Sequence, residues 1–275
     1  MAGTTKKRKK PTSSAKKRAV NKKNPKLDKK AIKIIIAAVV AVIAIVAIAL
    51  AGNGKKVEKG KITLTGSIAE GVDVSSHNGK IDWKKVKNSA DFAIIRVGAR
   101  GYTKGEINPD KRAAYNLKHA NKNGVAAGVY FYSQAIDEKE AREEAEFVIE
   151  NIRKYDISLP VFIDYEYPTK NGQHTGRMFN AKHSKKERTA VLNAFCDTVR
   201  EAGYTPGIYA SSYIYKTEIV NRLIPDDVYI WVAEYNKEVS YEGFYDIWQY
   251  TESGSCDGID SKNVDLNYFY IDKRE

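Results

Sequence analysis

The sequence predicts an α/β fold: an irregular, TIM-like (β/α) barrel with a reduced number of helices, preceded by a single N-terminal transmembrane helix. Three observations predict it. Short apolar runs alternate with amphipathic segments from residue 71 onward, eight runs have the character of strands but only four or five segments that of helices, and residues 34–51 are apolar throughout. The chain accordingly divides into a basic tail (1–33), a membrane span (34–51), a linker (52–68) and one barrel domain (69–275).

The basic tail holds the whole net charge of +12. Its first 30 residues contain 13 Lys and Arg and a single acid, Asp28, and the rest of the chain is balanced in charge. The barrel therefore lacks an overall basic charge, and we expect no nucleic-acid partner. The tail is too polar to bury a core, so we expect it to remain cytoplasmic and to attract anionic membrane lipids. The alternative is a cytoplasmic arm that binds nucleic acid or another partner.

The predicted span consists of 18 residues without a polar face, about 27 Å long as a helix and close to the thickness of a bilayer core. A cleaved signal peptide is the alternative, because Ala49-Leu50-Ala51 before Gly52 has the small-x-small form of a cleavage site. The apolar core and the basic region before it are both longer than in a signal peptide, which favours an uncleaved anchor. The linker that follows is rich in Gly and Lys and should act as a flexible tether of about 20 Å.

The barrel elements follow from their periodicity. Helices are expected over 82–88 and 110–123, over 137–155 behind a D-x-x-E cap at Asp137, and from Ser184, which opens an S-x-x-E capping box. After Gly203 the strands follow one another with little helical sequence between them, so a parallel barrel should have short or missing helices there. The eight predicted strands are 71–77, 92–98, 125–133, 159–167, 205–211, 229–235, 245–250 and 264–270.

The two cysteines, Cys196 and Cys256, form neither a disulfide framework nor a metal-binding spacing. Cys196 lies in the helical pattern VLNAFCDTV, which suggests a small buried hydrophobe. One bridge between the two residues is possible, but folding should depend on the apolar core.

Four acidic residues are expected where strands end, which is the face of a (β/α) barrel that carries reactive groups. They are Asp73, Asp164, Glu166 and Asp265. Side chains alternate along a strand, so Asp164 and Glu166 should point to one side and Tyr165 to the other. Two carboxyl groups beside the apolar VFI run should raise at least one pKa, as a general acid for glycosidic bonds requires. The alternative for D-x-E alone is a salt-bridged strand end.

Aromatic residues crowd the same strand ends and could stack on sugar rings, although about half of them should be ordinary packing. They are Tyr130, Tyr132, Tyr209, Trp231, Tyr235, Trp248 and Tyr250. The four histidines lack the H-E-x-x-H spacing of zinc enzymes, and neither G-x-S-x-G nor a phosphate-binding glycine loop is present. We therefore expect neither a metal nor a cofactor.

Eight segments of the barrel resemble the family 25 glycoside hydrolases, the Chalaropsis-type lysozymes or N-acetylmuramidases, in order and spacing over residues 71–270. They are GVDVSSHNGKIDW, FAIIRVG, GVYFYS, PVFIDYEY, PGIYAS, WVAEY, DIWQYT and VDLNYF. The resemblance implies a barrel with fewer than eight helices that hydrolyses the β-1,4 bond between N-acetylmuramic acid and N-acetylglucosamine in peptidoglycan.

The resemblance also implies roles for individual residues. Glu166 matches the general acid, and Asp164 its partner, which orients the substrate or polarises its N-acetyl group for internal attack. Asp73 and Asp265 match the remaining acids of the groove. The expected substrate-binding residues are Tyr132, Tyr209, Trp231, Tyr235 and Trp248.

Combined with the span, these features predict a monomeric muramidase in the bacterial cell membrane. It would cross the membrane once, with its N-terminus in the cytoplasm and its barrel outside acting on peptidoglycan glycan strands in cell-wall remodelling. The alternative is a membrane-tethered peptidoglycan-binding module without turnover.

Overall fold

The computed structural model describes residue 62 and residues 64–274. The predicted tail, the predicted span and all but the last part of the linker lie outside the described residues. Over the described ranges, no helix combines the length and the apolar character needed to cross a bilayer.

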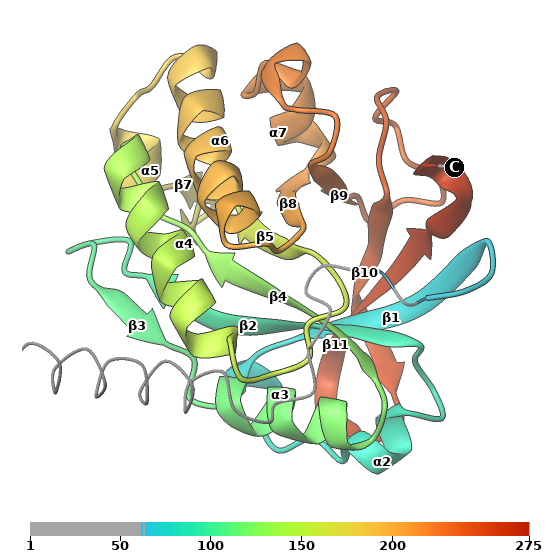
Figure 1. Cartoon of the computed structure of the whole chain (residues 1–275). Helices are drawn as coiled ribbons and strands as arrows, with labels where there is room; N and C mark the ends of the chain where they lie inside the picture. The colour runs from blue at the N-terminus through green and yellow to red at the C-terminus, as the bar shows by residue number, and fades with distance from the viewer. Residues whose placement is uncertain (1–61, 63, 275) are drawn as a thin grey trace, which may run out of the picture. The chain divides into compact units, whose positions relative to one another are not determined.

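Eight strands close into a barrel (Figure 1). Each strand is hydrogen-bonded to the next in the order β1-β2-β4-β5-β8-β9-β10-β11, and β11 pairs with β1 to close the ring. All eight predicted strands are confirmed. Their bounds are β1 Ile68–Val74, β2 Phe92–Arg100, β4 Ala126–Tyr132, β5 Val161–Asp164, β8 Pro206–Ser211, β9 Tyr229–Ala233, β10 Ile247–Cys256 and β11 Ile259–Tyr270.

The direction of the last strand corrects the prediction of a parallel barrel. Strands β1 to β10 run parallel to their barrel neighbours, whereas β11 is antiparallel to both β10 and β1. Only Asp257 and Gly258 separate β10 from β11, and a parallel crossover needs a dozen or more residues. Asp-Gly is a typical two-residue hairpin turn, and Gly258 has the positive φ of +92° that such a turn favours.

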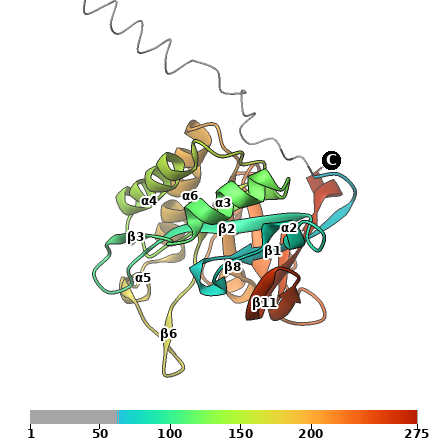
Figure 2. The same ribbon diagram turned by 90° about the horizontal axis from the view of Figure 1, so that it is seen from below.

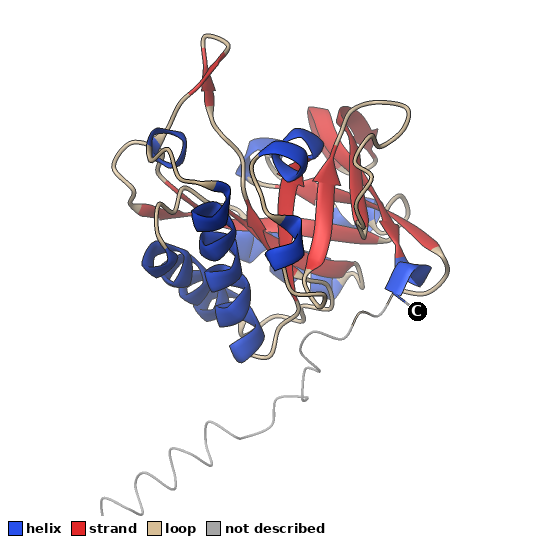
Figure 3. Ribbon diagram, turned by 90° about the horizontal axis from the view of Figure 1, so that it is seen from above, coloured by secondary structure: helices blue, strands red, loops and turns tan. Residues whose placement is uncertain are grey.

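Three helices of ten or more residues cover one side of the barrel (Figures 2 and 3). Asp137 caps α4 by accepting a hydrogen bond from the Glu140 amide, and Ser184 and Glu187 form the predicted capping box of α6. In the described part of the chain, α7 is short and no α-helix follows β9 or β10, which confirms the expected loss of later helices. The helices are α2 Trp83–Val86, α3 Ala113–Lys122, α4 Glu138–Ile152, α5 Arg177–Asn180, α6 Lys185–Glu201 and α7 Ser212–Thr217.

Two apolar clusters hold the domain together. The outer cluster lies between the strands and the helices and includes Cys196, whose prediction as a buried hydrophobe is confirmed. Cys196 and Cys256 are both free thiols. The inner cluster fills the barrel below the cavity, and glycine at position 207 makes room for it, since a β-carbon there would lie 2.3 Å from the Phe162 ring. Each buried phenylalanine contributes about 1.5–3 kcal/mol to folding.

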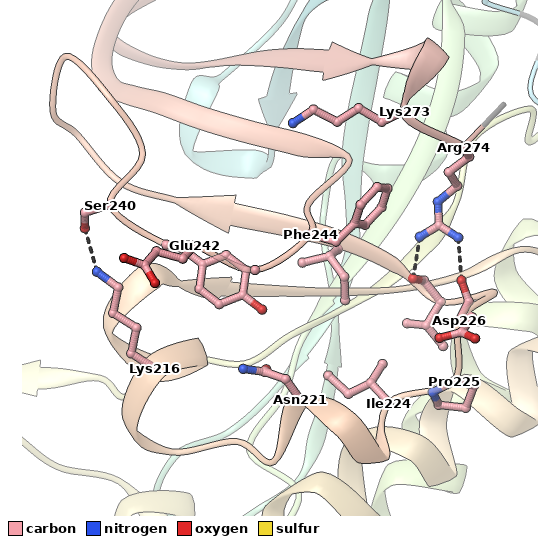
Figure 4. A pocket seen from close by; sticks show the side chains of 14 residues that line it. Lys216, Asn221, Ile224, Pro225, Asp226, Ser240, Glu242, Phe244, Lys273 and Arg274 are labelled. Atoms are coloured by element: carbon pink, nitrogen blue, oxygen red, sulfur yellow. Dashed lines mark hydrogen bonds between the residues drawn. The ribbon is translucent and has the colours of Figure 1, made fainter.

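A buried ion pair closes the other end of the barrel, where the chain leaves β11 through the 3-10 helix η3 (Ile271–Arg274). Asp246 is fully buried, and its Oδ2 accepts hydrogen bonds from the Ile230 amide at 2.7 Å and from Arg274 Nη2 at 2.8 Å. The Arg274 guanidinium also donates to the carbonyl oxygens of Asp226 and Val228, both at 2.7 Å, beside a cavity of about 990 Å3 (Figure 4). Arg274 therefore ties η3 to the loop before β9.

Replacing Arg274 with alanine should lower the free energy of unfolding by about 3 kcal/mol, because it leaves the Asp246 carboxylate buried without its counter-ion. Urea denaturation measures this change. Lys273→Ala is the matched control, since the Lys273 ammonium lies over the Tyr245 ring and should contribute about 0.5–1 kcal/mol. Equal losses from the two variants would show that the buried pair does not stabilise the fold.

Candidate active site

A cavity of about 520 Å3 opens at the end of the barrel where the parallel strands terminate. All four predicted acidic residues line it, together with four of the five predicted substrate-binding aromatics. The lining predicted from the sequence comprises Asp73, Asp164, Glu166, Asp265, Tyr132, Tyr209, Trp231 and Tyr235. The barrel thus collects residues that are almost 200 positions apart in the chain.

Asp164 and Glu166 reach the cavity as the alternation predicts. Asp164 is the last residue of β5, Glu166 lies two residues beyond it, and the intervening Tyr165 packs into the outer cluster. Asp265 corrects the expectation that every acid ends a strand, because it lies in the middle of β11. Since β11 enters the barrel from the cavity side, Asp265 nevertheless lies directly opposite Asp73 in the β1–β11 register.

Asp73 is held by two buried amide side chains. Its Oδ2 accepts hydrogen bonds from Gln249 Nε2 at 2.8 Å and from Asn267 Nδ2 at 2.9 Å. Asn267 is oriented in turn by Trp231, whose Nε1 donates to Asn267 Oδ1 at 2.9 Å. Because both amides have their donors turned toward the carboxyl group, Asp73 has a single preferred position on the cavity wall.

Gln249 connects this network to two tyrosines. The hydroxyl groups of Tyr209 and Tyr235 both donate to Gln249 Oε1, at 2.8 and 2.7 Å. Because Gln249 Oε1 accepts two hydrogen bonds from hydroxyl groups, the orientation of the amide is fixed, and its Nε2 faces Asp73. Tyr209 is buried, whereas Tyr235 lines the cavity and is 47% exposed.

Asp73 and Asp265 influence each other's ionisation. Burial raises the pKa of Asp265 to about 8, and the charge of Asp73 and a hydrogen bond to it act in the same direction. Burial also raises the pKa of Asp73, although the hydrogen bonds from Asn267, Gln249 and Asp265 oppose the rise. Both carboxyl groups are therefore shifted toward their protonated forms, and they titrate as a pair.

Glu166 and Asp164 are also shifted toward their protonated forms. Burial, with the charges of Asp73 and Glu252, raises the pKa of Glu166 to about 7. Burial and the charge of Glu166 raise the pKa of Asp164 well above its usual range. Near neutral pH the cavity therefore carries fewer negative charges than it has carboxyl groups, so a proton is available to a bound substrate.

Asp164 also presents an unused hydrogen-bonding atom. Its Oδ1 is buried and has no hydrogen-bond partner among the described residues. Burying such an oxygen without a donor costs about 1–3 kcal/mol. A substrate N–H or O–H that reached Asp164 Oδ1 would recover this cost.

Trp248 is the predicted site residue that does not line the cavity. Its two neighbours on β10 face inward: Ile247 belongs to the inner cluster and Gln249 contacts Asp73. Because side chains alternate along a strand, the Trp248 indole lies on the outside of β10. There its Nε1 donates to the Glu234 carbonyl oxygen at 2.8 Å and its ring lies 6.0 Å from that of Tyr268. Trp231 lines the cavity floor but is only 1% exposed, so it packs under a ligand and offers no open ring face.

The sequence analysis missed several polar residues of the site: Arg96, Gln249 and Glu252, which line the cavity, and Asn267, which is fully buried and donates to Asp73. Arg96 places a guanidinium among the carboxyl groups, where its charge partly opposes the rise in the pKa of Asp164 that burial causes. Its Nη2 is 2.8 Å from the buried Asp110 carboxylate. A signal existed for three of them, because Arg96 in FAIIRVG, Gln249 in DIWQY and Asn267 in VDLNYF are polar residues inside apolar strands.

A smaller cavity of about 350 Å3 adjoins the first and shares Glu166, Tyr209, Tyr235 and Glu252 with it. Glu166 therefore lies between the two cavities. Tyr213, which is 57% exposed, lines the smaller one. A linear ligand could cross Glu166 with one unit on each side.

Comparisons with known proteins agree with this geometry. The model of the glycosyl hydrolases family 25 matches residues 72–259. The modular autolysin LytC of Streptococcus pneumoniae, solved with a synthetic peptidoglycan ligand, is 30% identical over 76% of this chain, with a TM-score of 0.62. The chain spans about half of that protein, 48% of its length.

Two further relatives are similar. The structure of a family 25 glycosyl hydrolase from Bacillus anthracis is 26% identical, with a TM-score of 0.60, over 82% of this chain and 97% of that one. A lysozyme of Lactococcus phage mv1 is 28% identical over 123 residues, which are 42% of this chain and 57% of that protein.

Proposed function

Because this chain belongs to the glycosyl hydrolases family 25, we propose that it cleaves the β-1,4 bond between N-acetylmuramic acid and N-acetylglucosamine in peptidoglycan, with Glu166 as the general acid. The observation that carries the proposal is the position of Glu166, a protonatable carboxyl group between two adjoining cavities. The peptidoglycan ligand of the similar autolysin and the activity named for the phage lysozyme support the choice of substrate.

The chemistry follows from the placement of the acids. The muramic acid ring would lie in the larger cavity beside Asp164, and the glucosamine ring would lie in the smaller one. Glu166 gives its proton to the bridging oxygen as the bond from that oxygen to C1 breaks. Asp164 Oδ1 accepts a hydrogen bond from the N-acetyl N–H, which directs the acetyl oxygen toward C1 and lowers the pKa of Asp164. The acetyl oxygen bonds to C1 as the bridging oxygen leaves, which gives a cyclic intermediate. Water then adds to C1, the bond from C1 to the acetyl oxygen breaks, and the water gives a proton back to Glu166.

The remaining groups hold the substrate and tune the acids. Asp73, which Gln249 and Asn267 hold in place, contributes to the raised pKa of Glu166, and Asp73 and Asp265 both bind sugar hydroxyls. Tyr235, exposed at the opening, provides a ring face for stacking on a pyranose.

Release of reducing ends from purified peptidoglycan by the full chain tests the proposal. New reducing-end N-acetylmuramic acid, identified from the product masses, is the expected result. Cosedimentation with peptidoglycan without any new reducing end would instead support a binding module that lacks turnover.

The rate of cleavage should fall on the alkaline side with a midpoint near pH 7, because Glu166 acts in its protonated form and its pKa is about 7. Glu252→Gln should move this limb to lower pH, since it removes a negative charge that raises the pKa of Glu166. The pH profile of kcat/KM measures the shift. Glu238→Gln, which changes an exposed residue outside the cavity, is the control. If the alkaline fall in kcat/KM had the same midpoint in the wild type and both variants, the assignment of Glu166 would be contradicted.

We also infer a membrane location from the sequence. The charge-free run 34–51 and the basic tail before it support a single-pass anchor in the bacterial membrane with the barrel outside, and the tail's lysines and arginines support contact with anionic lipids. Cell fractionation tests this: recovery of the mature domain in the medium, beginning near Gly52, would indicate a cleaved signal peptide.

A further inference from the structure

A further cavity, about 950 Å3 in volume and called the side cavity, lies beside the 520 Å3 cavity that holds the acids, which is called the catalytic cavity. Tyr102 and Pro168 line both of them. Pro168 is two residues beyond Glu166, so the side cavity begins next to the proposed acid. The two cavities therefore adjoin along Tyr102 and Pro168.

Hydrogen bonds fix the walls of the side cavity. Arg177 forms a two-point ion pair with Glu140 of α4, at 2.7 and 2.8 Å, and its backbone amide donates to the Tyr102 carbonyl oxygen at 3.1 Å. The loop that carries Tyr102 is anchored by Arg100, which donates to the Gly105 carbonyl oxygen at 2.8 Å and pairs with the buried Glu144 at 2.7 Å. The cavity is therefore formed before a ligand enters it.

A tight hairpin supplies the outer wall. Strand β6 (Thr169–Lys170) pairs with β7 (Gln173–His174) through Asn171 and Gly172, whose φ values of 53° and 76° are those of a two-residue hairpin turn. The hairpin stands out from the barrel (Figure 2), and Lys170 lines the side cavity while remaining exposed. Among the described residues no carboxylate forms an ion pair with Lys170.

The charge of the side cavity is opposite to that of the catalytic cavity. Its lining contains Lys170 and Arg177 but no Asp or Glu, and its other polar groups are threonine hydroxyls, an asparagine amide and a tyrosine hydroxyl. Arg177 is already paired with Glu140, which leaves the Lys170 ammonium to attract an anion. The complement of this lining is an acidic ligand with several hydrogen-bonding groups.

We propose that the side cavity binds the peptide stem attached to the muramic acid residue, with Lys170 pairing with a stem carboxylate. The stem joins the lactyl group of the sugar that lies beside Glu166, and it offers both amides and carboxylates. This proposal rests on the proposed function and adds a specificity: the chain prefers glycan that carries its stems.

The test compares full-length protein on two soluble glycans of equal chain length, one with intact stems and one whose stems have been removed at the lactyl amide. The wild type should have the higher kcat/KM on stem-bearing glycan. Lys170→Glu should reduce this preference by about threefold to tenfold, mainly through KM, and Lys170→Gln by less. Added salt should also weaken the preference of the wild type. Lys118→Glu on α3, which makes the same charge change outside the side cavity and outside both cavities at Glu166, is the control.

The outcomes separate the two proposals. A preference that is lost in the Lys170 variants and kept in Lys118→Glu supports stem binding. Equal preference in all four proteins, or a wild type that cuts both glycans equally well, overturns stem binding and leaves the proposed function standing. A wild type that cuts neither glycan overturns the proposed function itself.

Discussion

Replacing Glu166 with glutamine should lower the rate of peptidoglycan cleavage by a factor of about 10² to 10⁴, the usual contribution of a general acid. Glutamine has nearly the same shape but cannot give a proton to the bridging oxygen, so binding to the glycan should change little. The loss should appear in kcat, measured by the release of reducing ends.

Folding gives this variant an independent check. Burial raises the pKa of Glu166 to about 7, above its value in the unfolded chain, so the native state loses stability as the pH rises from about 4.5 to 7. Glu166→Gln should therefore be at least as stable as the wild type at pH 8. Glu146→Gln, an exposed residue of α4, is the matched control and should retain full activity. Activity of Glu166→Gln within twofold of the wild type would show that another group is the acid.

The second large effect is expected at Asp164. Asp164→Asn should lower kcat by about 10² to 10³ with a smaller change in KM, because an asparagine amide cannot match a carboxylate that accepts the N-acetyl N–H and stabilises the positive charge that develops on the substrate. The buried and unpartnered Oδ1 is the atom on which this expectation depends.

The same substitution should stabilise the protein at neutral pH. Burial and the charge of Glu166 raise the pKa of Asp164 well above its unfolded value, so ionising it opposes folding, and an asparagine avoids that cost. Thermal unfolding at pH 7 measures the gain, and Asp260→Asn, on the exposed part of β11, serves as the control for both readouts. A variant that loses stability and activity together would point to a structural role for Asp164.

Apolar runs were sufficient to predict the strands, capping motifs to predict the caps of α4 and α6, and strand alternation to predict the shared orientation of Asp164 and Glu166. All three depend on neighbours along the chain. The direction of β11 was missed although Asp257-Gly258 carries a hairpin signal, since a barrel of repeated βα units suggested one more parallel strand. The two-residue turn, and not the repeated βα pattern, determines the direction of β11.

The acidic residues of the site could be predicted from the sequence, but the residues that hydrogen-bond to them could not. Hydrogen bonds from Gln249 and Asn267 to Asp73 span 176 and 194 residues, and only the closing of the barrel brings these groups together. Trp248 was misplaced because both faces of IWQY mix apolar and polar character, so the pattern does not show which face is inward. The β6–β7 hairpin was not predicted, because its strands are two residues long and exposed.

The antiparallel return of β11 has a practical consequence for protein engineering. Ile68 and Tyr270 are partners in the β1–β11 register, and the Ile271 amide donates to the Ser67 carbonyl oxygen at 2.9 Å. The first and last strands of the barrel therefore begin and finish side by side, at the rim remote from the carboxyl groups. A short peptide could join these two points and the backbone could be reopened in an exposed loop, which makes the barrel a candidate for circular permutation. An affinity module fused at that rim would leave the catalytic cavity open to the glycan.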